Sequence, residues 1–160
     1  MPDPNLKPQT LKNVLHVARA AEGSAMFQHL FVKNVKTGQE FDALDGGDLS
    51  CAFFVSTVLT MAQLIDRPHA TVETTLQKMQ EANWRKVADP SAGAVVYWPG
   101  KDQAHSHIGF YLGDSECVSN SSTDRKPKIH GLMLADGRQP ECFYLHNSLH
   151  NPFPSDQQMV

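Results

Sequence analysis

One stretch decides how this chain is expected to fold: CAFFVSTVLTMAQLI, residues 51–65. It is apolar on nearly every side, which predicts a helix that lies in the core rather than on the surface. The segment before it, residues 45–50, is rich in Gly and Asp, so the helix is expected to begin at Cys51. Asp66-Arg67-Pro68 is expected to end it, because proline cannot continue a helix.

Cys51 is therefore predicted to lie in the first turn of a buried helix. A helix N-terminus carries a partial positive charge and unpaired N–H groups. Both favour the thiolate over the thiol and lower the pKa of a cysteine. A thiolate held there is a nucleophile if a base can reach it. The alternative is a structural one, in which Cys51 is a small buried hydrophobic residue, as most free cysteines are.

The rest of the chain predicts helices first and strands afterwards. Two further helices are expected over residues 11–22 and 72–83, capped by Thr10 and Thr71. Residues 26–35 fit a helix or a strand, and residues 36–38 read as a turn. Five β-type runs follow Trp84, over residues 93–98, 107–112, 116–120, 128–133 and 142–146. This order predicts an α+β fold, with the helices packed on a five-stranded antiparallel sheet.

Length and composition predict one domain. The chain has 160 residues, of which 41% are hydrophobic, enough for one core of ordinary size. Residues 1–9 are polar and proline-rich and are expected to be a flexible segment, followed by a single domain over residues 10–150. Residues 151–160 are expected to be a C-terminal tail. The sequence indicates no particular oligomeric state.

Charge and hydropathy exclude several partners. A formal net charge of -3 gives no reason to expect nucleic acid or an anionic membrane as a partner. No apolar stretch is long enough to span a bilayer. The N-terminus lacks the basic and apolar regions of a signal peptide, so the chain as written is expected in the cytoplasm, with a specialised or non-classical export route left open.

Neither the cysteines nor the histidines predict a metal site. Three cysteines without a CxxC pair argue against a disulfide framework and against a thiolate zinc site. His105 and His107 have a spacing that would place them on one strand face, but no acid or cysteine pattern accompanies them. We therefore expect no metal and no cofactor.

A cysteine nucleophile needs a general base and a third group that orients the base. Among eight histidines, His107 stands out because it begins a predicted strand. A cysteine on a helix that faces a histidine on a strand is the papain-like arrangement. His130 follows a basic turn; it is predicted at the surface, with a position in the cleft as the alternative.

Three segments resemble one known family. CAFFVS, residues 51–56, resembles the nucleophile helix of the NlpC-type, papain-like cysteine peptidases of bacterial cell walls. PSAGAVVYW, residues 90–98, resembles the PGDVVFF strand of that family, and HIGFYLG, residues 107–113, resembles its HVGIYLG strand. The matches occur in the family's order at compatible spacing. The resemblance, shared with the related CHAP amidases, implies a papain-like fold with Cys51 as nucleophile and His107 as base.

The resemblance implies a third polar residue on the strand after His107. Counting along that strand places Ser119 in register. A single bulge in the hairpin would bring Asn120 in instead. We predict Asn120, with Ser119 as the alternative, because an amide carbonyl can accept the Nδ1–H of the imidazole and fix its tautomer.

Two residues depart from the family pattern. Ser50 and Leu49 stand where the family usually has Asp and Tyr, next to the predicted oxyanion site. The backbone N–H of Cys51, at the helix start, can still donate to an oxyanion.

These patterns predict a cysteine hydrolase that cleaves an amide or peptide bond. The resemblance implies a peptide or peptidoglycan fragment as substrate, most of all the peptidoglycan stem peptide. Two alternatives remain: a thioesterase or acyltransferase that uses the same cysteine and histidine, and a catalytically degenerate binding domain on the same scaffold.

Overall fold

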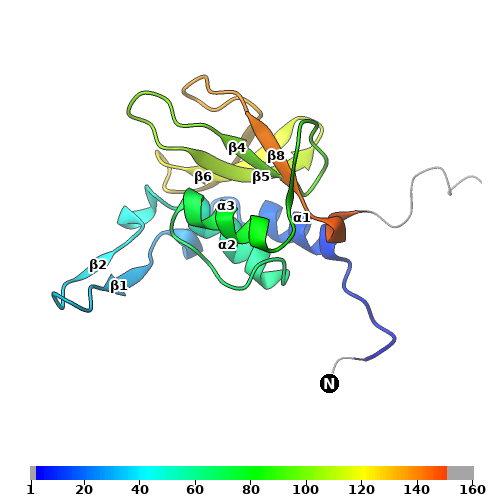
Figure 1. Ribbon diagram of the computed structural model, residues 1–160. Helices are drawn as coiled ribbons and strands as arrows, with labels where there is room; N and C mark the ends of the chain where they lie inside the picture. The colour runs from blue at the N-terminus through cyan, green and yellow to red at the C-terminus, as the bar shows by residue number, and fades with distance from the viewer. Residues whose placement is uncertain (1–2, 151–160) are drawn as a thin grey trace, which may run out of the picture.

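A layer of helices covers one face of an antiparallel sheet (Figure 1). The structure, a computed structural model, describes residues 3–150, so the predicted tail and the first two residues lie outside it. Within that range the helices are α1 (Thr10–Ala20), α2 (Cys51–Met61) and α3 (Val72–Glu81), with 3-10 turns at Ala25–Phe27, Asp45–Gly47 and Asn147–Leu149. The predicted α+β class is confirmed.

The main sheet of the described chain has six strands rather than the five predicted. Its order is β3-β8-β4-β5-β6-β7, and every neighbouring pair is antiparallel. The strands are β3 (Arg85–Val87), β4 (Val95–Trp98), β5 (His107–Gly113), β6 (Glu116–Ser121), β7 (Lys126–Gly131) and β8 (Cys142–Leu145). The extra strand, β3, pairs with β8 at the edge of the sheet. It is only three residues long, too short for an alternating pattern to reveal it.

Helix α2 begins at Cys51, as predicted, but ends at Met61, four residues before the predicted end. Gln63 has a φ of 58°, in the left-handed region that stops a helix, and the N–H of Leu64 returns to the carbonyl of Leu59 at 2.9 Å. The helix therefore ends by a local turn rather than at Pro68.

Of the two predicted helix caps, one is confirmed and the other is wrong. Thr71 caps α3 by accepting from the N–H of Thr74. Thr10 is wrong as a cap, because it is the first residue of α1 and Gln9 holds the cap position.

Helix α2 is attached to the sheet by an aromatic cluster close to Cys51. Phe54, one turn after Cys51, is fully buried and makes edge contacts with Phe27 at 5.1 Å and Phe110 of β5 at 5.7 Å between ring centroids. Burial of one such ring stabilises a fold by roughly 1.5–3 kcal/mol. The start of α2 is thus fixed against β5, the strand that carries His107.

The register of β5 and β6 is set by Gly109, which lies directly opposite Ser119. A Cβ on Gly109 would come within 2.6 Å of both the Ser119 Cβ and the Val118 carbonyl oxygen, so only glycine fits. The hairpin does contain an irregularity, but it lies between Tyr111 and Gly113, beyond this pair. Ser119 consequently keeps the register expected from counting.

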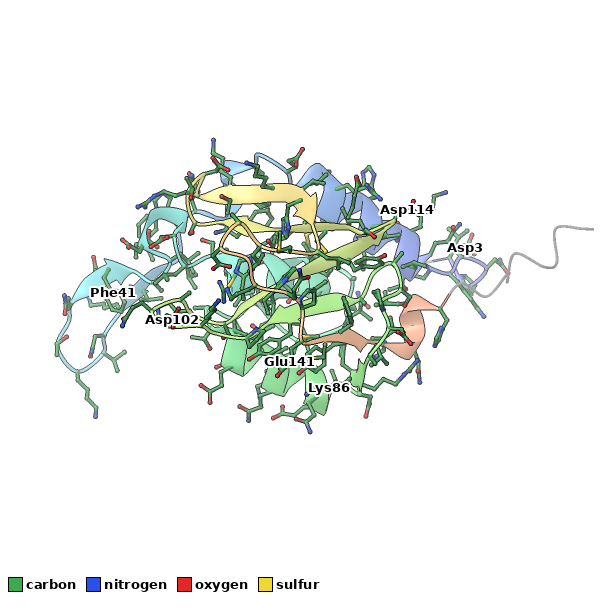
Figure 2. All side chains as sticks on the ribbon, turned by 90° about the horizontal axis from the view of Figure 1, so that it is seen from above. Asp3, Phe41, Lys86, Asp102, Asp114 and Glu141 are labelled. Carbon is green, nitrogen blue, oxygen red and sulfur yellow. The ribbon has the colours of Figure 1, made fainter. Side chains whose placement is uncertain are left out.

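A separate two-stranded hairpin projects from the body of the molecule (Figure 1). It is formed by β1 (Phe31–Lys33) and β2 (Glu40–Asp42), and it exposes Phe41 at its side (Figure 2). Asp42 ties its base to the chain before α2, accepting from the N–H groups of Leu30, Leu44 and Gly46 and contacting the His29 ring at 2.7 Å. The ambiguous residues 26–35 therefore contain both a helical turn and a strand.

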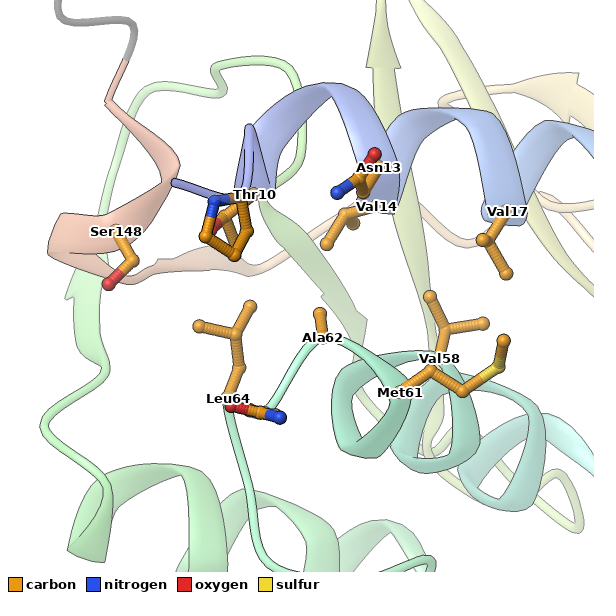
Figure 3. A pocket seen from close by; sticks show the side chains of 11 residues that line it. Thr10, Asn13, Val14, Val17, Val58, Met61, Ala62, Leu64 and Ser148 are labelled. Carbon is orange, nitrogen blue, oxygen red and sulfur yellow. The ribbon is translucent and has the colours of Figure 1, made fainter. Parts of the chain in front are cut away.

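A cavity of about 530 Å³ lies between α1 and the end of α2 (Figure 3). Val14 and Val17 of α1 face Val58 and Met61 of α2 across it. It opens at the opposite end of α2 from Cys51, so it plays no part in the site described next. Among the helices of residues 3–150, none combines the length and apolar character needed to cross a bilayer.

Candidate functional site

Cys51 is held in place by the loop that precedes it. Gly47 has a φ of 101°, and a Cβ there would meet the Arg125 carbonyl oxygen at 2.6 Å, so the loop packs directly on the turn after β6. Two side chains fix it: the Asn120 amide donates to the Gly47 carbonyl at 2.8 Å, and the Arg125 guanidinium donates to the Asp45 carbonyl at 2.8 Å. The loop that leads into α2 is therefore held by β6 and by the turn that follows it.

The Cys51 thiol is half-buried and its pKa is raised. Burial is the main cause, because it disfavours the charged thiolate. The backbone N–H groups of Ile108, Ala52 and Cys51 act in the opposite direction but do not outweigh it. The helix N-terminus was expected to lower this pKa; the net shift is the reverse, and the resting group at neutral pH is a thiol.

His107 is the first residue of β5 and lies opposite Trp98 of β4, with ring centroids 5.5 Å apart. Burial lowers the pKa of His107 to about 4, and the nearby positive charge of Arg138 acts in the same direction. The ring is thus neutral at pH 7, the form that can accept a proton.

Cys51 meets β5 at its first residues, through the backbone of Ile108. The N–H that faces the thiol belongs to Ile108, the residue after His107. Within residues 3–150 no hydrogen bond joins the Cys51 Sγ to the His107 ring. Such contacts are often long in unliganded enzymes and shorten when substrate binds.

Ser119 and Asn120 point to opposite faces of β6, as neighbouring strand residues do. Ser119 lies opposite Gly109 and so shares a face with His107, two residues along β5. Asn120 lies on the helix-covered face, where its amide holds Gly47. Its Oδ1 is buried and has no hydrogen-bond partner in the described part of the chain. Both residues line the cleft that His107 lines, and in the described structure neither is hydrogen-bonded to the His107 ring.

His130 of β7 belongs to the same cluster, although it was predicted at the surface. Its Nε2 lies 2.6 Å from the Ser119 Oγ, and its Nδ1 lies 2.6 Å from the Gly131 carbonyl oxygen. The ring is 5.7 Å from Trp98, which also contacts His107. Burial lowers the pKa of His130. The only sequence signal was the alternation of β7, and it could not be used without the register between β6 and β7.

His107, Ser119 and His130 line one cleft of about 630 Å³. Its remaining lining is mostly polar, with three acids, two bases and a short apolar wall over residues 133–135. Arg138 holds the loop after β7 in place, because it pairs with Asp136 at 2.9 Å and donates to the carbonyls of Pro99 and His105. The cleft offers a neutral imidazole and hydroxyl groups, and Cys51 is not among the residues that line it.

The other cysteines are strand residues, and Cys117 lies directly opposite His130 in the pairing of β6 with β7. Cys117 and Cys142 are buried in β6 and β8, and each is a free thiol in the described structure, like Cys51. Burial raises the pKa of Cys117 to about 12. Residues 3–150 contain no group of three or more His, Cys, Asp or Glu side chains placed to hold a metal ion.

Solved structures with a similar fold place the chain among the NlpC/P60-type folds. The peptidoglycan hydrolase RipB from Mycobacterium tuberculosis matches with a TM-score of 0.51 and 19% identity, over 86% of this chain and 64% of that one. A protein similar to a lipoprotein of the NLP/P60 family, from Staphylococcus aureus, matches with a TM-score of 0.51 and 15% identity, over 93% and 45%. The predicted papain-like NlpC fold is confirmed, and the chain spans less than two thirds of the length of either protein.

Sequence comparisons add nothing to this likeness. No protein-family model matches the chain, and no curated protein matches it.

Proposed function

We propose that this protein is a cysteine hydrolase that cleaves amide bonds in peptides, with Cys51 as nucleophile and His107 as general base. The observation that carries the proposal is the position of the Cys51 thiol. It lies at the N-terminus of α2, against the N–H of Ile108, the residue that follows His107 in β5. A nucleophile and a base on two rigid elements are what acyl transfer requires.

The pKa shifts favour a neutral resting pair over a preformed thiolate and imidazolium. His107 takes the thiol proton as the sulfur attacks the carbonyl carbon. The N–H of Cys51 then donates to the developing oxyanion. His107 returns the proton to the leaving amine, and a thioester remains on Cys51. Water, deprotonated by His107, cleaves the thioester, releasing the acid and restoring the thiol.

The cleft supports a peptide substrate over an acyl chain. Most of the residues that line it are polar or charged, and the apolar ones are confined to one wall. Acids and bases on one cleft suit the free carboxylate and amine groups of short peptides. The fold shared with RipB, described as a peptidoglycan hydrolase, supports stem peptides of peptidoglycan as the substrate class.

The test compares the wild-type protein with Cys51→Ala and His107→Ala on purified muropeptides, with product peptides measured by mass spectrometry. Both variants should lose turnover, while His16→Gln, on the exposed side of α1, should keep it. Turnover that survives both substitutions would refute the mechanism. Because the pKa of His107 is about 4, kcat/KM should hold on acidification until about pH 4 rather than fall near pH 6.5.

A second candidate is a binding domain that has lost catalysis. The raised pKa of Cys51 and the departures at Leu49 and Ser50 favour it. Calorimetry with the same muropeptides separates the two proposals. Binding without product, at the same affinity in the Cys51→Ala variant, would identify the binding domain.

A further inference from the structure

The histidine at position 130 has a defined proton arrangement. Its Nδ1 lies 2.6 Å from the carbonyl oxygen of Gly131, which can only accept a hydrogen bond. Nδ1 must therefore carry the ring proton. In the neutral ring Nε2 is then an acceptor, and the Ser119 Oγ, 2.6 Å away, must donate its one proton to it.

This arrangement determines whether the Ser119 hydroxyl can donate or accept a further hydrogen bond. A serine hydroxyl normally rotates and can donate or accept. With its proton committed to His130, the Ser119 oxygen has only lone pairs to offer. A group on the same sheet face can then bond to it only as a donor, and a ring N–H of His107 is such a donor.

We propose that His130 is a positioning residue of this site, which holds the Ser119 hydroxyl so that its oxygen accepts an N–H of His107 and fixes the tautomer of that ring. The inference rests on the proposed function. It makes Ser119 the third member of the site and adds a fourth member that the sequence motifs do not contain. Asn120 keeps a separate role, since its amide is engaged with the loop before Cys51.

The residues around His130, Ser119 and His107 fit this role. Trp98 is fully buried and contacts both His107 and His130, so it keeps the two rings on one side of the sheet. Gly109 has no side chain, so β6 packs closely against β5 at Ser119. The charged residues that line this cleft are Lys128 on the strand of His130, Asp136 and Arg138 on the following loop, Asp124 on the turn before β7, and Asp48. Lys128 favours the neutral form of His130, in which Nε2 is an acceptor.

The test uses three variants: Ser119→Ala, His130→Leu and His130→Gln, whose side-chain carbonyl can replace the acceptor Nε2. Turnover of muropeptides is measured as kcat and KM separately, and ¹⁵N NMR reports the tautomer of His107. Ser119→Ala and His130→Leu should each lower kcat by about 10–100-fold with little change in KM, as loss of an orienting partner does. Their double variant should be no worse than either one, and His130→Gln should recover most of the rate.

The NMR measurement separates this inference from the proposed function. If the wild-type protein turns over no muropeptide, the proposed function fails, but the His107 tautomer still tests His130. A single tautomer in the wild type that becomes mixed in His130→Leu and is restored in His130→Gln supports the inference. An unchanged tautomer in His130→Leu overturns it, as does a double variant whose loss is the product of the two single losses. Thermal melts and His16→Gln control for unfolding.

Discussion

Two buried serines, one just before α2 and one in its middle, allow a direct test of how this helix is stabilised. Ser50 and Ser56 are both fully buried. The Ser50 Oγ, just before Cys51, has no hydrogen-bond partner within residues 3–150. The Ser56 Oγ accepts from the His69 N–H at 2.8 Å and donates to the His69 carbonyl at 3.1 Å. The same substitution, Ser→Ala, should therefore have different effects at the two positions.

The contacts give the expected size of the difference. Ser56→Ala removes two hydrogen bonds that join α2 to the loop at residue 69. At 0.5–1.5 kcal/mol each, the free energy of unfolding should fall by about 1–3 kcal/mol. Ser50→Ala removes a hydroxyl that bonds to nothing in the described structure, and it should leave the stability within about 0.5 kcal/mol or raise it.

Urea unfolding measures the free energy of unfolding of the two variants, and a thermal melt measures their Tm, both followed by circular dichroism. For a chain of this length, Tm should fall by about 2–4 °C for each kcal/mol lost in Ser56→Ala. Equal losses in the two variants would refute the reasoning, because they would show that the Ser50 hydroxyl has a partner or that the His69 contacts contribute nothing. A larger loss in Ser50→Ala would refute it more strongly.

Three further predictions follow from the same structure. Iodoacetamide should alkylate Cys51 slowly at pH 6 and faster only above the usual thiol pKa, since burial raises its pKa; rapid labelling at pH 6, measured by mass spectrometry, would contradict this. Hydrogen bonds, first that from the Leu30 N–H, lower the pKa of Asp42, so its contribution to stability is complete above its unfolded pKa and is lost as pH falls through the lower folded value. Asp42→Asn should accordingly flatten the acid side of the stability profile in urea titrations. Gly109→Ala, whose Cβ would meet Ser119 at 2.6 Å, should destabilise the fold by about 1–3 kcal/mol, and a wild-type Tm would contradict the register.

Elements with strong local patterns could be predicted from sequence. Helix α2 begins at Cys51, as the Gly- and Asp-rich segment before it predicted. Thr71 caps α3, as its residue type suggested. What could not be predicted was decided by tertiary pairing. β3 has three residues and exists because β8 offers it a partner, and α2 ends where Gln63 adopts a left-handed conformation that its residue type does not signal.

In the candidate site, too, local patterns predicted some features and strand pairing decided the others. Cys51 and His107 stand at the ends of elements whose positions follow from the motifs. The choice between Ser119 and Asn120 depended on whether a bulge shifted the hairpin, and the irregularity lies beyond the pair that matters. The chemical preference for an amide over a hydroxyl pointed to Asn120, whose NH₂ group donates to the Gly47 carbonyl while its Oδ1 has no partner in the described structure. A local argument could not find that contact, which joins residues far apart in the chain.

The loop before Cys51 is held without help from the side chain at position 50. Position 50 is completely buried, and within the described chain the hydroxyl there finds no partner. Position 50 is the N-cap of α2, where an aspartate carboxylate could accept from the first N–H groups of the helix, whereas the Ser50 side chain makes no such bond. The loop is held instead by Asn120 and Arg125, which reach it from β6 and the following turn. The start of α2 is therefore held from the sheet side rather than by a side-chain cap on the helix itself.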